Sequence, residues 1–326
     1  MNILFYGFRH GHIDGLYRMA SKCPDIGKIY CTEDNDEARN AASERLGITF
    51  ENIRSEDALT ELDIDIVAIG TRYGERGSVA IKALSAGKHI IADKPLCTNL
   101  CELDDIERLS QEKNLCIGCM LDLRYMPSAI RAKKLYESGK YGKLCNISFD
   151  GQHCIDYANR PSWYFEKGMH GGTINDLGIH GVDLVRHIFG VEFLNTEYAD
   201  VRNKYAYKHE HFKDCAMFVC TLSDNAKLMA DVSYSAPANQ ASLPTYWLFR
   251  CWLEKGMMTF SYGCENVTVY DADGNVLTFE GERAKNTYLD DFLTEIKYGK
   301  RDFTDSVIAS TRVCLGIQQV ADRKMK

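Results

Sequence analysis

The sequence predicts an α/β protein: an N-terminal Rossmann-type, doubly wound parallel sheet, then an α+β domain with a large, mostly antiparallel, open-faced sheet. Over the first 120 residues, short apolar runs alternate with helical patterns, which is typical of a parallel sheet covered on both faces. After Pro127 the pattern changes to long alternating runs between Asp, Asn and Gly turns. The 326 residues are enough for two domains, predicted at 1–121 and 122–326.

Each predicted element follows from its local pattern. The N-terminal strands are residues 3–6, 28–31, 64–69, 89–92 and 115–120, and the helices are 35–46, 77–86 and 100–113. A helix at 128–138 precedes the second sheet, whose predicted strands are 144–149, 216–222, 227–234, 247–252, 257–262, 267–270 and 276–279. An antiparallel sheet with helices on one face leaves its other face to solvent or to another subunit. We therefore expect a homodimer or homotetramer.

Composition narrows the class of partner. The formal net charge is −7 and no long basic run occurs, which argues against a nucleic-acid surface. No apolar stretch approaches the roughly 20 residues that span a bilayer, and a basic leader is absent at Met1. The 13 cysteines are an odd number in a long chain, so we expect mostly reduced core residues. These features predict a cytoplasmic protein that binds a small molecule, not nucleic acid or a membrane.

Two short motifs that resemble metal sites are better explained without a metal. Cys116 and Cys119 fall in one predicted buried strand, where an odd offset sends the side chains to opposite faces. His209 and His211 flank Glu210 without an apparent third ligand, so an exposed loop is the better interpretation. We expect no metal site.

The first predicted strand leads into a glycine loop of the kind that holds a dinucleotide. Gly7 matches the first position of the G-x-G-x-x-G pattern, whereas Arg9 and His12 occupy the second and third. The guanidinium and imidazole could rebuild the phosphate site with side chains. Alternatively, they mark a loop that binds nucleotide weakly or not at all. A strand before the loop and a helix after it favour retained binding.

Glu33 lies about 20 residues beyond the loop, where an acid can accept hydrogen bonds from a ribose diol. It could instead cap the following helix. An acid at this position repels a 2′-phosphate, so NAD is favoured as cofactor. NADP stays an alternative, because Arg9 or Arg72 could bind its 2′-phosphate.

A lysine, an aspartate and a histidine form a second candidate site. Lys94 lies between Asp93 and Pro95, where a predicted strand ends. Asp176 and His180 follow a pair of glycines, four positions apart, so one face of a helix would carry both side chains. Such groups can remove a proton from an alcohol, with the imidazole as base. A structural surface pair of Asp176 and His180 is the weaker alternative.

The order of these motifs resembles that of the Gfo/Idh/MocA family, named after glucose-fructose oxidoreductase, inositol dehydrogenase and rhizopine catabolism. The resemblance rests on the strand–loop–helix beginning and on later stretches at residues 65–71, 86–89, 93–96, 124–127, 139–142 and 171–183. It covers nearly the whole chain. It implies an oxidoreductase that transfers a hydride between NAD or NADP and a sugar, cyclitol or related polyol.

The resemblance also implies roles for individual residues. The family's lysine, aspartate and histidine line a pocket beside the nicotinamide, and they correspond to Lys94, Asp176 and His180. His180 would be the base, Lys94 would stabilise the alkoxide, and Asp176 would bind a hydroxyl or orient the imidazole. The peptide between Lys94 and Pro95 is expected to be cis.

This chain departs from the family on the cofactor side. Where the family has a glutamate, a threonine-proline pair and a histidine, this chain has Asp93, Thr71-Arg72 and Arg76 respectively. The candidate cofactor-binding residues are Gly7, Phe8, Arg9, His10, Gly11, His12, Glu33, Thr71, Arg72, Arg76, Asp93, Lys94 and Pro95. The candidate substrate-binding residues are Trp163, Tyr164 and Asn175; for the two aromatics, packing within the second domain is an equal alternative.

Two other functions stay open. One is a lyase or glycosidase of the same fold that uses bound NAD for transient oxidation and releases no reduced cofactor. The other is a ligand-binding protein that has lost turnover. Dinucleotide binding separates the last from the enzymes, and net formation of reduced nicotinamide separates the two enzymes.

Overall fold

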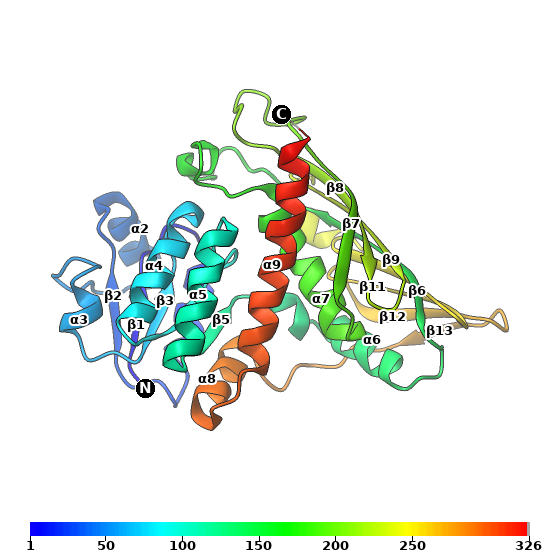
Figure 1. Cartoon of the computed structure of the whole chain (residues 1–326), viewed down its shortest axis with the longest axis horizontal. Helices are drawn as coiled ribbons and strands as arrows, with labels where there is room; N and C mark the ends of the chain where they lie inside the picture. Colours follow the sequence, from blue (N-terminus) through cyan, green and yellow to red (C-terminus); the bar gives the residue numbers. More distant parts are fainter. Residues whose placement is uncertain (325–326) are drawn as a thin grey trace. The chain divides into compact units, whose positions relative to one another are not determined.

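The computed structural model describes residues 1–324, which form two compact units (Figure 1). Unit 1 comprises Met1–Met120, Pro161–Gly171 and Tyr288–Thr311. Unit 2 comprises Leu121–Arg160, Gly172–Thr287 and the chain from Arg312 onward. Each unit is therefore assembled from segments that are distant in the sequence. The continuous division into 1–121 and 122–326 stays a prediction.

Unit 1 contains a five-stranded parallel sheet in the order β2-β1-β3-β4-β5. The strands are β1 (Ile3–Tyr6), β2 (Ile29–Thr32), β3 (Ile66–Ile69), β4 (His89–Ala92) and β5 (Ile117–Cys119). Every residue of β1 and β3 is buried, as expected for strands covered on both faces. The predicted Rossmann-type sheet is confirmed.

Unit 1 contains several helices. They are α1 (His12–Ala20), α2 (Asp36–Leu46), α3 (Ala58–Glu61), α4 (Tyr73–Ser85), α5 (Leu100–Lys113) and α8 (Tyr288–Tyr298), and a short 3-10 helix spans Ser162–Phe165. The Asn35 and Asn99 side chains accept the amides of Ala38 and Glu102 and so cap α2 and α5. Helix α4 begins at Tyr73, four residues before the predicted start.

Unit 2 contains an eight-stranded sheet in the order β13-β12-β11-β10-β6-β9-β8-β7. The strands are β6 (Leu144–Gln152), β7 (Phe193–Arg202), β8 (Cys215–Leu222), β9 (Lys227–Ser233), β10 (Leu248–Leu253), β11 (Gly256–Ser261), β12 (Cys264–Asp271) and β13 (Val276–Phe279). All neighbours are antiparallel except β6 and β9. The predicted mostly antiparallel sheet is therefore confirmed.

Helices cover one face of this sheet. Helix α6 (Pro127–Glu137) packs on β11 and β12, and α7 (Ile179–Phe189) packs on β6. Short 3-10 helices at Asp122–Tyr125 and Gln240–Ser242 and a π-helix at Ile174–Gly178 complete the unit, together with the C-terminal part of α9 (Asp302–Arg323). Burial alternates along β8 and β10, as expected when the other face is open within the chain.

The sequence analysis missed the short helix α3 and three longer elements. It placed no strand at β7, whose polar centre and two register shifts weaken the alternation. It also named no helix at α8 or α9. Helix α9 carries buried apolar residues at Phe303, Val307, Cys314 and Ala321, a helical period that could have been recognised.

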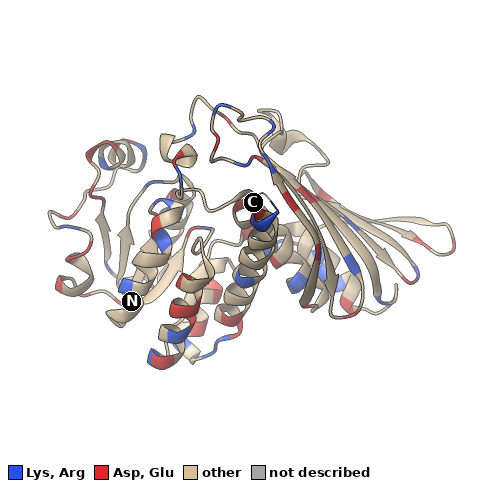
Figure 2. Ribbon diagram, turned by 45° about the horizontal axis from the view of Figure 1, so that its top comes forward, with Lys and Arg blue, Asp and Glu red and all other residues tan. Residues whose placement is uncertain are grey.

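Charged residues of both signs are interspersed along the ribbon, as on α5 (Figure 2). Arg108 of α5 pairs with Asp105 and Glu112 at 2.9 and 3.0 Å, with all three side chains about half exposed. Exposed pairs of this kind contribute about 0–1 kcal/mol, so they do not determine the fold. Over residues 1–324, we find no helix with the length and apolarity needed to cross a membrane.

Close packing of α7 on β6 requires a glycine at position 181. A Cβ there would lie 2.3 Å from the Phe149 ring. We expect Gly181→Ala to lower the free energy of unfolding by about 1–3 kcal/mol, the usual cost of overpacking, in urea denaturation. The matched control is Gly316→Ala in α9, where a Cβ meets nothing within 4 Å. It should stabilise by about 0.5–1 kcal/mol, and equal effects of the two changes would contradict the packing argument.

Candidate active site

The predicted cofactor-binding residues of unit 1 gather at the carboxyl edge of its sheet. Directly after β1, β2, β3 and β4 come Gly7, Glu33, the Gly70–Thr71 pair and Asp93. The strand order places a reversal of the chain path between β1 and β3. Nucleotides bind doubly wound sheets beside such a reversal.

Two glycines let the loops after β1 and β3 approach each other. Gly7 has φ +86°, and a Cβ there would lie 2.8 Å from Thr71 Cγ2. A Cβ on Gly70 would lie 2.3 Å from the Gly7 carbonyl oxygen and 2.7 Å from Ile13 of α1. The close helix contact expected of the third loop glycine is thus made by Gly70, which the sequence analysis missed.

The Glu33 carboxylate holds the loop to the turn after β2. It accepts the Phe8 amide at 2.8 Å and the Asn35 amide at 2.9 Å. Arg9 Nη1 lies 4.0 Å from Glu33 Oε1. The Phe8 ring is buried and contacts the Phe50 ring edge-on, so the Phe8 side chain packs in the core. A carboxylate has about four acceptor sites, so two amides leave capacity for a ligand hydroxyl.

The start of α1 has no side-chain cap. Gly11 precedes the helix in open space, and the half-exposed His12 is its first residue. Amides at such a helix start attract anions. Arg72, in contrast, is already occupied by two acids, Glu75 and Glu166, the latter at 3.4 Å.

Asp93 and Arg76 form a fully buried ion pair beneath this edge. Arg76 Nη2 lies 2.6 Å from Asp93 Oδ2, and both side chains have no exposed surface. The same guanidinium donates to the carbonyls of Thr71, Asp93, Lys94 and Pro95. The Arg76 cation, with His10, holds the pKa of Asp93 well below its usual range. Arg76 therefore supports the turn that carries Lys94.

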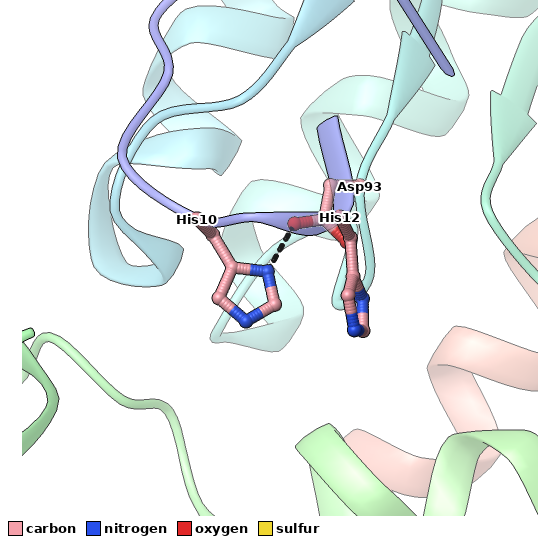
Figure 3. Close-up of side chains that lie close together, drawn as sticks. All are labelled: His10, His12 and Asp93. Atoms are coloured by element: carbon pink, nitrogen blue, oxygen red, sulfur yellow. Dashed lines mark hydrogen bonds and ion pairs between the residues drawn. The ribbon is translucent and has the colours of Figure 1, made fainter. Parts of the chain in front are cut away.

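Two histidines of the loop flank the Asp93 carboxylate (Figure 3). His10 Nδ1 lies 2.7 Å from Asp93 Oδ2, and His12 Nδ1 lies 3.4 Å from Oδ1. Burial lowers the pKa of His10 to about 3, against the opposing pull of Asp93. His10 Nε2 is 3.1 Å from the Tyr73 hydroxyl. Both ring nitrogens of His10 are therefore engaged.

Ligand atoms of His10, His12 and Asp93 all lie within 4.8 Å of one another, close enough to consider a metal ion. The donor chemistry disfavours one. His10 uses both nitrogens in hydrogen bonds, and Asp93 is neutralised by Arg76. A cation bound here would face a guanidinium and would displace His10 from its partners. The expectation of no metal site stays a prediction that this geometry supports.

Lys94 is nearly fully buried at the carboxyl end of β4. The predicted cis peptide between Lys94 and Pro95 is confirmed. The neighbouring carboxylate of Asp93 is already paired with Arg76. Arg76 of α4 donates to the Lys94 carbonyl, and His10 and His12 contact the preceding residue, Asp93. We call the loop at residues 7–12, which carries these histidines, the nucleotide loop.

Trp163 and Tyr164 belong to unit 1, not to the second domain as expected. Both are buried. The Trp163 ring lies 5.0 Å from the Tyr73 ring, and its Nε1 donates to the Arg9 carbonyl at 3.2 Å. The Tyr164 hydroxyl lies 2.5 Å from that of Tyr73. This favours the packing alternative, with the nucleotide loop as the partner.

Asp176 lies in unit 2 on a π-helical turn, where a single α-helix was expected. Gln318 Oε1 accepts the amide of Ile174, the first residue of the turn, at 3.0 Å and so caps its start. The hydroxyl of Tyr234 donates to Asp176 Oδ2, and Asn175 beside it is fully buried. Tyr234 follows β9, and the sequence offered no signal for its partner.

His180 lies near the start of α7 in unit 2, and is largely buried. Its Nδ1 is 3.6 Å from Asp122 Oδ1, and its ring meets the Trp247 ring edge-on at 5.4 Å. Trp247 has φ +52°, a conformation rare for a bulky residue and common at functional sites. A Cβ on Gly151 would lie 2.6 Å from the Trp247 ring, so the indole can pack here only because residue 151 is a glycine.

A buried ion pair fixes the segment that carries Asp122. Arg124 Nε donates to Asp183 Oδ2 at 2.6 Å, and Nη2 donates to Oδ1. Asp183 lies one turn beyond His180 on α7. This bidentate pair therefore sets the approach of Asp122 to His180. The sequence analysis did not single out Asp122, Arg124 or Trp247 as site residues.

Two family models match the chain. Residues 10–120 match the oxidoreductase family with an NAD-binding Rossmann fold, and residues 129–259 match the GFO/IDH/MocA C-terminal domain. The chain belongs to the Gfo/Idh/MocA family. The resemblance inferred from the motifs is thereby confirmed, together with the two-sheet fold of that family.

Relatives in the family include sugar dehydrogenases. The chain is similar to the levoglucosan dehydrogenase of Pseudarthrobacter phenanthrenivorans, with 33% identity over 165 residues, 48% of this chain and 41% of that protein. It is also similar to the D-xylose dehydrogenase of Paenarthrobacter nicotinovorans, with 28% identity over 144 residues, 42% and 37% respectively. The matches thus span less than half the length of these curated relatives.

A solved family structure shares the fold over the whole chain. The complex of levoglucosan dehydrogenase with NADH and levoglucosan has a TM-score of 0.84 and 19% sequence identity. The match covers 100% of this chain and 98% of that one. At this identity the likeness establishes the Gfo/Idh/MocA fold alone.

Two histidines whose pKa values are lowered, the buried His10 and the partly buried His187, predict a pH dependence of stability. Burial lowers the pKa of His10 to about 3 and that of His187, beside Lys133 and Arg124, to about 4. In the unfolded chain a histidine pKa is about 6.5, so between these values the unfolded chain binds more protons. The free energy of unfolding should therefore fall as pH falls from about 6.5 towards 4, by at most about 1.4 kcal/mol per pH unit for each histidine.

Urea denaturation at several pH values across this range measures the effect. The His187→Gln variant should show a smaller pH slope than the wild type, whereas the exposed-site control His211→Gln should keep it. A wild-type stability that does not change over this range would contradict the neutral state of both rings.

Proposed function

We propose that the protein is an NAD(P)-dependent oxidoreductase that transfers a hydride between the nicotinamide and a CH–OH group of a sugar, cyclitol or related polyol. The observation that carries the proposal is Lys94, a buried lysine at the carboxyl end of β4 in a Rossmann-type sheet. A lysine at this place can hold a hydroxyl oxygen next to a bound nicotinamide. Family membership and the sugar dehydrogenases among the relatives support the substrate class.

The residues at the sheet edge fit a dinucleotide. Thr71 Oγ1 is buried and has no hydrogen-bond partner among the described residues, as expected of a group that awaits a ligand. Gly7 lets Thr71 approach the loop after β1, and the uncapped start of α1 suits the phosphates of a dinucleotide. Glu33 has capacity for a ribose hydroxyl and disfavours a 2′-phosphate, so we propose NAD as the preferred cofactor.

The bound cofactor would supply hydride acceptance and donation. Lys94 would hold the reacting hydroxyl oxygen and stabilise negative charge as it develops there. His180 Nε2 would take the hydroxyl proton, since its Nδ1 side is directed to Asp122. Asp176, held by Tyr234, would bind a neighbouring hydroxyl. In the reverse direction the same atoms return the proton to the carbonyl oxygen.

Activity and binding assays test this function. We expect heat of binding with NAD or NADH in calorimetry, and absorbance of reduced nicotinamide when NAD is mixed with a panel of polyols. Lys94→Met and His180→Asn should each lower kcat at least about 100-fold, the scale of lost proton handling. The control Lys82→Met removes an exposed lysine of α4 that pairs with Glu56. It should retain wild-type rates.

Each result has a defined meaning. Absence of binding by NAD, NADH, NADP and NADPH would exclude the dehydrogenase and favour a ligand-binding protein. Substrate consumption without net reduction would favour the hidden-redox enzyme. Normal rates in both site variants would exclude the assigned residues.

We also propose that the open face of the eight-stranded sheet binds a second copy of this chain. Val219, Met229, Ser148 and Arg250 form one row across four strands on this face. Met229 and Trp252 are more than half exposed there. Large exposed apolar residues on a sheet face are typical of interfaces. All 13 cysteines are free, which supports a reducing, cytoplasmic location.

Light scattering after size exclusion tests the interface. We expect the wild type to elute as a dimer or tetramer, and Met229→Glu to shift it towards monomer because a charge would be buried in the contact. Lys82→Glu, on a helix of unit 1, serves as the control. A monomeric wild type would refute the proposed interface.

A further inference from the structure

The segment Pro161–Gly171 contacts both the nucleotide loop and the start of α4, and all of these parts belong to unit 1. We call it the docking segment. Trp163 Nε1 donates to the Arg9 carbonyl at 3.2 Å, and the Gly74 amide donates to the Met169 carbonyl at 2.8 Å. A Cβ on Gly74 would lie 2.3 Å from the Gly168 carbonyl oxygen, so the two backbones touch. The chain before and after this segment belongs to unit 2.

A line of buried hydrogen bonds connects the docking segment to the ion pair at the sheet edge. The Tyr164 hydroxyl lies 2.5 Å from the Tyr73 hydroxyl, which lies 3.1 Å from His10 Nε2. His10 Nδ1 lies 2.7 Å from Asp93 Oδ2. All four side chains are buried. We call this line the Tyr164–Asp93 array.

Chemistry fixes the direction of each hydrogen bond in the array. Asp93 is an ionised carboxylate paired with Arg76, so it only accepts. His10 Nδ1–H must then donate to Asp93, which leaves Nε2 of the neutral ring as an acceptor. Tyr73 therefore donates its single hydroxyl proton to His10. The Tyr73 oxygen in turn accepts a hydrogen bond from the Tyr164 hydroxyl.

The array is suited to holding groups in place, not to moving protons. A relay would need His10 to carry a second proton, but burial lowers the His10 pKa to about 3. At pH 7 the ring is therefore neutral. The neutral ring is thus a fixed acceptor for Tyr73. What the array determines is the position of Tyr164 and of the docking segment that carries it.

We propose that the Tyr164–Asp93 array locks the docking segment onto the nucleotide loop, so that dinucleotide affinity depends on Tyr73 and Tyr164, which no dinucleotide need touch. Both tyrosines are positioning residues. The nucleotide loop lacks the second and third glycines of the G-x-G-x-x-G pattern. Arg9 occupies the position of the second glycine, and Trp163 donates a hydrogen bond to its carbonyl. The affinity part of this inference rests on the proposed function; the locking part does not.

The test uses Tyr73→Phe, Tyr164→Phe and the double variant, with Tyr17→Phe as control. Tyr17 lies in α1 of the same unit, outside the array. Each change removes one hydroxyl and keeps the ring. Hydrogen exchange of peptides that cover residues 7–12 and 161–171 reports locking in the free protein. Calorimetry with NADH reports affinity, and initial rates report KM for the dinucleotide against kcat.

Tyr164→Phe loses one buried hydrogen bond of the array, and Tyr73→Phe loses two. We expect both variants to speed exchange in both peptides, by about 2- to 10-fold for each hydrogen bond lost. NADH affinity should fall by a similar factor, and KM for the dinucleotide should change by a larger factor than kcat. The double variant should be no worse than Tyr73→Phe, because the two hydroxyls share one bond. Tyr17→Phe should match the wild type.

Three results would overturn the inference. These are exchange in the array variants equal to that of Tyr17→Phe, additive effects in the double variant, and unchanged NADH affinity despite faster exchange. If the wild type binds no dinucleotide, the proposed function fails, but the exchange data still decide whether the array locks the segment.

Discussion

The buried pair of Asp93 and Arg76 is the interaction on which the rest of unit 1 depends. Both side chains are fully enclosed, so neither charge could remain without the other. Arg76 uses its other donors on the carbonyls around Lys94, and Asp93 uses its other capacity on His10. One ion pair therefore connects the strand that presents the lysine to the loop that follows β1.

The departures from the family pattern form a set. Asp93 and Arg76, which both depart from the family pattern, form a buried ion pair. His10 donates to the same carboxylate, and its neutral ring accepts from Tyr73. In the sequence, Asp93 and Arg76 were two separate departures. In the structure they support one another, because each supplies the partner that another buried polar group requires.

The fold and the turn that carries Lys94 could be predicted from the sequence because both depend on local sequence patterns. Strand periodicity defined both sheets, and the lysine-proline motif defined the turn. Contacts between distant residues could not be predicted in this way. Nothing in the sequence joins Tyr164 to Tyr73, Tyr234 to Asp176 or Arg124 to Asp183, because such pairs depend on the path of the chain in space. The cap of the π-helical turn was missed for the same reason, since Gln318, which accepts the Ile174 amide, is 144 residues away.

The chain path through the docking segment has a consequence for modular exchange. Unit 1 draws on three separate stretches of sequence, of which the docking segment is the middle one. A cut after residue 121 would therefore release a fragment that lacks Trp163 and Tyr164, so that the Tyr73 hydroxyl would lose its contact with the Tyr164 hydroxyl. Recombination at that point between two such proteins would join a nucleotide loop to a foreign docking segment. The two parts must consequently be inherited together, even though a stretch of unit 2 separates them in the sequence.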